Sequence, residues 1–218
     1  MNGHDVKNEG TEIVQQKRAP IGFGSQGVQL ASLEEAFRFA NAIVASGFAP
    51  KGMEKSESVL VAIQLGAEIG LTPMAALQNT AVINGRPAIY GDAALALVRA
   101  SGLLQSYKEE EIGEAGTDAH GYRVTAMRKG DQTGIETFTV ADAKRAKLWG
   151  KAGPWSDYPK RMLRFRARGY VLRDLFGDVL KGLRTVEEAH DIPAEPINVT
   201  PLADKVAAGL TSQIGGAA

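Results

Sequence analysis

The residues best suited to binding chemistry in this chain are concentrated between Lys144 and Arg173. Ten basic residues there stand against one acid, Asp157, so the segment carries a charge of about +9. Aromatic residues are interleaved with the cations: Trp149, Trp155, Tyr158, Phe165 and Tyr170. Cations neutralise phosphates, and flat rings stack on bases whatever their identity. The segment therefore predicts a surface that binds single-stranded nucleic acid.

The candidate binding residues of this segment are its basic positions and one tryptophan: Lys144, Arg145, Lys147, Lys151, Trp155, Lys160, Arg161, Arg164, Arg166, Arg168 and Arg173. On a helix predicted from about residue 158 to 175, four of the cations share one side by the 3.6-residue period. These four are Lys160, Arg161, Arg164 and Arg168, and they form one predicted basic stripe. The alternative to a binding surface is an ordinary solvated helix face, although such faces usually mix both signs of charge.

Arg166 and Arg173 fall among the apolar residues on the other side of the predicted helix. A guanidinium among apolar neighbours needs a partner. Both arginines could therefore be structural, paired with Asp174, with Asp178 or with an acid on a neighbouring subunit. For Trp149 and Trp155, stacking on bases and packing in the core stay open.

A second candidate contact is the tip of a predicted hairpin over residues 81–90, where two β-prone runs flank Asn84 and Gly85. Pro87 lacks a donor for the strand ladder, which favours a sheet edge or a projecting finger. Asn84 and Arg86, and with them Tyr90, would contact nucleic acid if such a finger wedged between base steps. Turn geometry by itself also explains an Asn-Gly pair.

Other chemistry has little support in the sequence. The chain has no cysteine, and His4, His120 and His190 are scattered without ligand spacing, so neither a metal nor a cofactor is expected. Consecutive residues of the 109–111 glutamate cluster would point to opposite faces of a strand, so they cannot converge on one ion. The glycine-rich run 22–27 lacks the phosphate-loop pattern, which leaves ATP binding unsupported.

Local signals predict an α+β protein: N-terminal helices, a β-hairpin, and a three-stranded antiparallel meander packed with helices. Capping boxes mark helices that begin after Ser32 and Thr185, Thr139 and Asp142 are expected to start another helix, and Asp92 is expected to cap a further one. The expected helices cover about 33–46, 57–69, a short stretch after 73, 93–100, 139–148, 158–175 and a short stretch after 185. The expected meander strands cover 103–112, 120–128 and 134–139.

The predicted domain organisation is a flexible arm over 1–27, one core domain over 28–192 and a flexible tail over 193–218. No apolar run reaches the length of about 18 residues that a membrane span requires, and the absence of cysteine suits a reducing cytoplasm. The balance of 25 basic and 25 acidic residues gives no net charge, so only the distribution of charge points to a partner.

Two stretches, residues 70–102 and 138–167, resemble the RecT family of phage and prophage single-strand annealing proteins. The specific part is the run P-W-x-x-Y-P-x-x-M-x-x-x-R-A over residues 154–167, and the resemblance extends from about Leu30 to Asp191. It implies a Redβ/RecT-like annealing core with a basic groove for DNA and a β-hairpin beside it. It also supports the basic and aromatic positions of 144–173 and the hairpin tip 84–86 as contacts.

The resemblance further implies a recombinase that acts without ATP or other cofactor, coats single strands as an oligomeric ring or helical filament, and pairs complementary strands. Implied partners are a phage exonuclease and the host single-strand-binding protein, in the cytoplasm of a bacterial host. Three other hypotheses stay open: a passive single-strand binder, a Mg²⁺-dependent nuclease that uses Asp92 or the 109–111 cluster, and a structural phage oligomer that buries its basic face.

Overall fold

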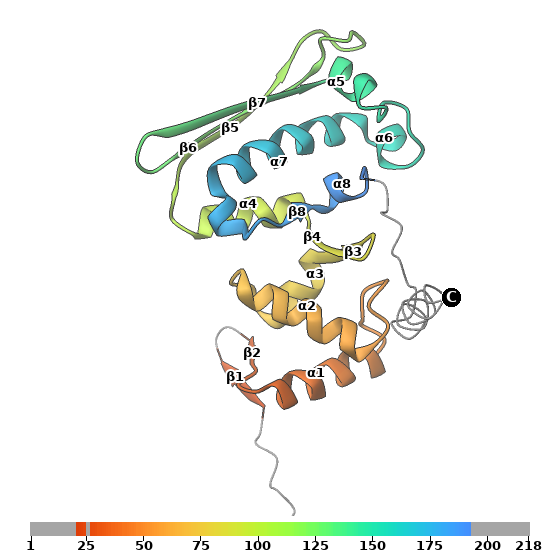
Figure 1. Cartoon of the computed structure of the whole chain (residues 1–218), viewed down its shortest axis with the longest axis vertical. Helices are drawn as coiled ribbons and strands as arrows, with labels where there is room; N and C mark the ends of the chain where they lie inside the picture. The colour runs from red at the N-terminus through yellow and green to blue at the C-terminus, as the bar shows by residue number, and fades with distance from the viewer. Residues whose placement is uncertain (1–20, 25–26, 193–218) are drawn as a thin grey trace, which may run out of the picture. The chain divides into compact units, whose positions relative to one another are not determined.

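The computed structural model describes residues 21–24 and 27–192, which divide into two compact units at Gln78 and Asn79. Helices and strands are mixed along the chain (Figure 1), which confirms the predicted α+β class. The single core domain over 28–192 stays a prediction. Of the arm and the tail, all but residues 21–24 and 27 lie outside the described residues.

The first unit opens with a small antiparallel hairpin of β1 (Gly22–Gly24) and β2 (Gly27–Gln29). Helices α1 (Leu33–Ala45), α2 (Ser56–Glu68) and α3 (Pro73–Asn79) follow. The sequence predicts these three helices to within a residue or two of their ends, which is the usual uncertainty of helix boundaries.

Helix α1 begins with the predicted capping interaction. The Ser32 hydroxyl accepts a hydrogen bond from the Glu35 N–H at 3.2 Å, and the Glu35 carboxylate accepts one from the Ala31 N–H at 2.8 Å. The helices then bury a shared apolar core made of Ala40, Ile43, Met53, Val59, Ala62, Ile63 and Leu77. Gly66 of α2 permits a close approach, because a Cβ there would overlap the side chain of Ala76.

Among residues 21–24 and 27–192, no single helix is long and apolar enough to cross a membrane. Helices α2 and α3 reach that length and composition only as a pair bent by 105°.

The second unit begins with the predicted hairpin of β3 (Thr80–Ile83) and β4 (Arg86–Ile89). Asn84 and Gly85 form its turn with φ values of 52° and 73°, a left-handed conformation that Asn and Gly adopt at low cost. A short strand that the sequence does not signal, β8 (Arg184–Thr185), pairs in parallel with β4. The hairpin is therefore part of a three-stranded sheet.

The predicted meander is formed by β5 (Leu104–Ile112), β6 (Gly121–Arg128) and β7 (Gln132–Thr139), with β6 in the middle. Side chains alternate between the two faces. Val124 and Ala126 of β6 are fully buried on the face that packs against helix α7 (Pro159–Leu180).

Helix α7 runs across this face of the meander, as Figure 1 shows. Pro159 occupies its first turn, where a missing N–H costs nothing. Phe165 and Phe176 are buried, and non-helical angles at Phe176 (φ −129°, ψ 29°) mark a kink near the C-terminal end. The helix ends at Lys181 in the left-handed conformation.

Four shorter helices complete the unit: α4 (Gly91–Ala100), which packs on α7, α5 (Val140–Arg145), α6 (Pro154–Asp157) and α8 (Val186–Ala189). Thr139 and Asp142 start α5 as predicted, and they do so by forming a capping box.

Two other predicted caps are wrong. Asp92 lies inside the first turn of α4, and its carboxylate binds Arg161 and Arg168 instead. Thr185 precedes α8, but its side chain makes no capping bond, and Glu188 pairs with Arg173 rather than reaching back. In both places an arginine of α7 engages the carboxylate, which a local sequence pattern does not reveal.

Candidate nucleic-acid interface

The N-terminal half of α7 presents three cations to solvent. Lys160, Arg161 and Arg164 expose 60%, 55% and 38% of their side chains. They lie on one side of the helix because their spacing follows its 3.6-residue period. We call these three residues the basic row. It is the part of the predicted stripe that solvent reaches.

Each cation of the basic row lies near a carboxylate supplied by another element. The nitrogen-to-oxygen distances are 2.9 Å for Lys160–Glu111, 3.3 Å for Arg161–Asp92 and 3.8 Å for Arg164–Glu109. Asp92 comes from α4 and the two glutamates from β5. Asp92 and Glu111 are themselves exposed, so water and dissolved anions compete for the cations that they hold.

The Lys160–Glu111 pair is the best formed of the three. The hydrogen bond from Lys160, followed by one from His120 at 2.7 Å, lowers the pKa of Glu111 to about 2. The same bond with Glu111 raises the pKa of Lys160. Both groups are therefore charged throughout the physiological pH range, and Lys160 is held in place on the surface.

Arg168, the fourth member of the predicted stripe, is buried, and the expectation that it faces solvent is wrong. Its side chain is 5% exposed, and it donates from Nε to Glu109 at 2.7 Å and from Nη1 to Asp92 at 2.6 Å. Burial opposes the ionisation of Glu109, but hydrogen bonds from Arg168 and Tyr107 outweigh it and keep the pKa of Glu109 below its usual range. Arg168 thus fixes the two carboxylates that hold Arg161 and Arg164.

Arg166 and Arg173 lie on the inner side of α7 and pair with the C-terminal end of the described chain. Arg166 donates to Asp191 at 2.7 Å, and Arg173 lies 3.0 Å from Glu188. Arg166 also lies 3.9 Å from the same Glu188 carboxylate. These side chains are mostly buried, so they tie α8 to α7 and do not offer free charge to a ligand.

The partners of these two arginines differ from those that the sequence suggests. Asp178 binds Arg128 through two hydrogen bonds of 2.6 and 2.7 Å, which lower the pKa of Asp178. Asp174 is exposed on α7. The structure favours the structural alternative that the sequence left open for Arg166 and Arg173, with acids of α8 and the residues after it as partners.

The two tryptophans have different environments. Trp155 is buried, and its indole N–H donates to both carboxylate oxygens of Asp191 at 3.0 Å. Its ring lies 6.3 Å from that of Phe138, tilted by 46°. Trp155 therefore packs in the core, whereas Trp149 and Tyr158 remain partly exposed on the surface.

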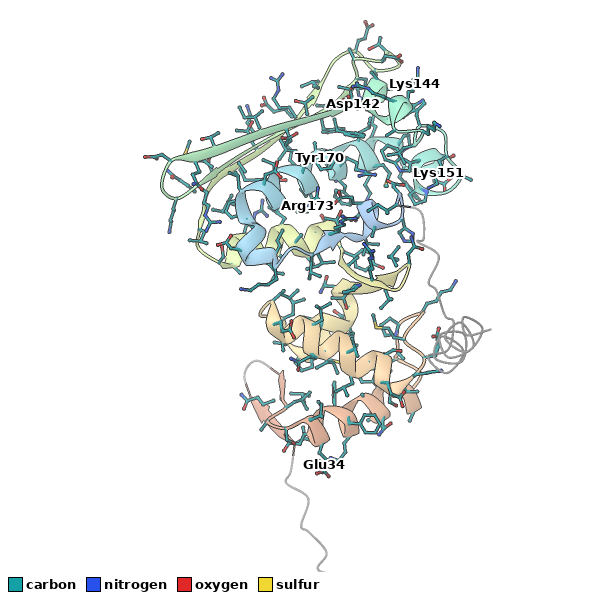
Figure 2. All side chains as sticks on the ribbon, viewed as in Figure 1. Glu34, Asp142, Lys144, Lys151, Tyr170 and Arg173 are labelled. Carbon is teal, nitrogen blue, oxygen red and sulfur yellow. The ribbon has the colours of Figure 1, made fainter. Side chains whose placement is uncertain are left out.

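Four cations of the predicted segment precede α7, and three of them are paired: Lys144 with Asp118, Arg145 with Asp142, and Lys151 with Asp191 at 3.8 Å. Figure 2 shows Lys144 beside Asp142 at one end of the meander and Lys151 near α6. Lys147 is exposed and has a φ of 57°, and it makes no ion pair within residues 21–24 and 27–192. Most of these side chains are about half exposed or more.

The predicted hairpin tip is tethered. The Asn84 side-chain amide donates a hydrogen bond to the carbonyl of Ile192 at 2.8 Å. One face of the hairpin, including Ala88, packs on Val186 and Ala189 of α8. Arg86 is exposed at the turn. The hairpin is thus a strand pair with one face covered by α8 and with an exposed turn.

Nine of the ten cations between Lys144 and Arg173 lie within 4.0 Å of a carboxylate, and seven carboxylates make these contacts. The acids that form separate clusters along the sequence, 109–118 and 187–191, fold onto the basic segment. The charge separation seen in the sequence is therefore largely neutralised in space. What remains accessible is the basic row together with the exposed cations before α7, which are Lys144, Arg145, Lys147 and Lys151.

A metal-dependent site has no support in the described part of the chain, where no group of three or more His, Cys, Asp or Glu side chains is arranged to hold an ion. Glu109 and Glu111 lie on the α7 side of the meander, and Glu110 pairs with Lys108. The glutamate cluster is divided between the two faces, as strand alternation predicts.

Sequence reasoning missed the residues that shape the surroundings of the basic row. No local signal reveals these roles of Asp92 and Glu111, because their partners on α7 lie 69 and 49 residues away in sequence. Tyr90, which the sequence indicates only together with a projecting hairpin, lies exposed directly after β4.

Comparison of the chain with protein-family models, with curated proteins and with solved structures finds no match. Its function is therefore argued from the geometry described above and from the residues of its sequence.

Proposed function

We propose that this protein binds single-stranded DNA and anneals complementary strands without ATP. The observation that carries the proposal is the basic row, in which Lys160, Arg161 and Arg164 stand exposed along one helix. The exposed ring of Tyr158 directly precedes this helix. Adjacent cations and an accessible ring are the two features that bind the backbone and the bases of a single strand.

The ion pairs of the basic row suit such binding. The carboxylates hold the cations in an extended arrangement, so less side-chain freedom is lost when a phosphate binds. A phosphate that approaches Arg161 competes with Asp92 at 3.3 Å, and one that approaches Arg164 competes with Glu109 at 3.8 Å. These long contacts are weaker than the ion pairs of 2.6 and 2.7 Å that hold Arg168. The surface cations Arg161 and Arg164 can thus exchange their carboxylate partners for phosphates.

Annealing requires that the bound strand leave its base edges available to a second strand. Contacts to phosphates leave those edges free, and they apply equally to any sequence. The resemblance of residues 70–102 and 138–167 to the RecT family supports annealing in particular, with a Redβ/RecT-like core, assembly into rings or helical filaments, and an exonuclease and a host single-strand-binding protein as partners. A passive single-strand binder is the second candidate, because the basic row supports it equally.

The test is the rate at which two complementary labelled oligonucleotides pair, measured by fluorescence energy transfer with and without the full-length protein. We expect the protein to speed pairing in the absence of ATP and Mg²⁺, and the double variant Arg161→Ala/Arg164→Ala to lose the acceleration. Slower pairing with wild-type protein would indicate a passive coat, and shortened DNA in a parallel reaction with Mg²⁺ would indicate a nuclease.

A matched control is available on the meander. The double variant Lys108→Ala/Arg123→Ala also removes two positive charges, one from β5 and one from β6. Lys108 and Arg123 alternate with Glu109 and Val124, so they point away from the face that packs on α7. This control should anneal like the wild type. Equal losses in both double variants would mean that only overall charge matters and that the basic row has no special role.

A further inference from the structure

A pocket of about 440 Å³ lies beside the start of α7, within the second unit. Its size falls in the range of about 300–1,000 Å³ that small-molecule sites occupy. Its floor is formed by the buried side chains of Trp155, Met162 and Val186, which belong to α6, α7 and α8. The floor is therefore apolar and fixed by the packing of three helices.

Two tyrosines line the same pocket and remain open to solvent. Tyr158 is 66% exposed and Tyr90 is 43% exposed. Tyr158 precedes α7, and Tyr90 follows β4, so elements far apart in the sequence bring the two rings to one pocket. Aromatic rings left accessible next to an apolar floor are suited to stack on another flat ring.

Cations line the pocket as well. Arg161 belongs to the basic row, and Lys151 lies 3.8 Å from Asp191. Each is about half exposed, and each has only a long contact to its carboxylate, which for Arg161 is 3.3 Å. In Figure 2, Lys151 lies next to α6, the helix that carries the floor residue Trp155. A ligand with a flat apolar ring and a nearby anionic group matches this combination.

Polar groups on the wall supply hydrogen bonds for the edge of such a ring. Glu187 accepts a hydrogen bond from the Gly91 N–H at 3.1 Å, and His190 lines the same wall and is exposed. A heterocycle with donors and acceptors on its edge would meet these groups, and a purely hydrocarbon ring would leave them unused.

We propose that this pocket holds one unpaired nucleobase of the bound single strand, stacked on Tyr158 and Tyr90, while Arg161 and Lys151 contact the adjoining phosphates. The proposal rests on the single-strand binding proposed above and deepens it. A base that is paired within a duplex is not free to enter, so the pocket explains how the protein selects an unpaired strand. Stacking on the floor and the rings makes no demand on base identity.

The experiment measures the affinity of the full-length protein for a labelled oligothymidylate and for an oligomer of the same length with abasic sites, which keeps the phosphates and removes the bases. Tyr158→Ala removes an exposed ring that makes no capping bond to α7, so the fold should persist. Tyr158→Phe keeps the ring. Trp149→Ala removes a partly exposed ring that does not line the pocket.

We expect Tyr158→Ala to weaken binding to oligothymidylate by about 5- to 150-fold, the loss of one stacked base, and to leave the abasic oligomer unaffected. Tyr158→Phe and Trp149→Ala should bind like the wild type. A 2-aminopurine base within the strand should be quenched by the wild type and not by Tyr158→Ala.

Two results would overturn the pocket while leaving single-strand binding intact: equal wild-type affinity for the two oligomers, or equal effects of Tyr158→Ala and Trp149→Ala. Failure of the wild type to bind either oligomer would instead contradict the proposed function itself, and the pocket with it.

Discussion

Replacing the buried Asp191 by alanine should strongly destabilise the second unit. The Asp191 carboxylate accepts hydrogen bonds from the Trp155 indole at 3.0 Å and from Arg166 at 2.7 Å, and its side chain is 4% exposed. Without it, the guanidinium of Arg166 keeps the Glu188 carboxylate at 3.9 Å and the neutral Tyr170 hydroxyl at 3.4 Å. The buried Arg166 guanidinium would then have no carboxylate within hydrogen-bonding distance.

The magnitude follows from this loss. Removing one partner of a buried ion pair costs about 3–5 kcal/mol, because the remaining charge is left without a partner. In a unit of roughly 100 residues, each kcal/mol lowers the thermal midpoint by about 4 °C. We therefore expect the midpoint to fall by about 12–20 °C, as measured by circular dichroism. Asp191→Asn keeps an acceptor oxygen and loses the charge, so its thermal midpoint should lie between those of the wild type and Asp191→Ala.

Asp174→Ala is the matched control, because Asp174 is an exposed carboxylate on α7. Its effect should stay within about 0.5 kcal/mol. If Asp191→Ala melts at the same temperature as Asp174→Ala, Arg166 does not depend on Asp191, and the structural role assigned to Arg166 and to Trp155 is wrong.

Three further predictions concern other contacts. Asp92→Asn removes the charge that competes for Arg161 at 3.3 Å, so fluorescence anisotropy should show an affinity for single-stranded DNA up to about fivefold higher than that of the wild type. The control Glu114→Gln should bind like the wild type. No gain in affinity with Asp92→Asn would mean that Asp92 does not compete with phosphate. The pKa of Glu111 is lowered from 4.5 to about 2, so the stabilising effect of its charged form is present above pH 4.5 and is lost as the pH falls towards 2. The difference in thermal midpoint between the wild type and Glu111→Gln should therefore shrink from pH 7 to pH 3. A difference that stays constant over this range would contradict the ion pair. Gly66→Ala should lower the free energy of unfolding, measured by urea denaturation, by about 1–3 kcal/mol, because the added methyl group would overlap Ala76. The methyl group of Gly177→Ala meets nothing within 4 Å, so this control should be neutral or slightly stabilising. Equal effects of the two substitutions would exclude close packing of α2 on α3.

The parts of the fold that the sequence predicts are those that nearby residues determine. Ser32 and Thr139 start helices because their side chains satisfy N–H groups within the next turn. Asn84 and Gly85 make a tight turn because they accept positive φ. The meander follows from β-prone runs separated by short glycine-containing turns. None of these features depends on distant contacts.

The parts that the sequence does not predict depend on contacts between distant residues. Strand β8 has two residues and exists because it pairs with β4, nearly one hundred residues earlier, with Ala88 opposite Arg184. Arg168 fits the exposed stripe by helical period, yet Glu109 and Asp92 draw it inward. A charge pattern along the chain therefore locates the basic segment, and only the fold separates its exposed cations from its buried ones.

The most direct test of the central claim, that the exposed basic row binds the phosphates of single-stranded DNA, is the salt dependence of affinity. For three phosphate contacts, a plot of the logarithm of the binding constant against that of the salt concentration should have a slope of about −2. The slope for Arg161→Ala/Arg164→Ala should be shallower by about 1.4, and that for Lys108→Ala/Arg123→Ala should match the wild type. An affinity that does not change with salt, or equal slopes for all three proteins, would contradict the claim.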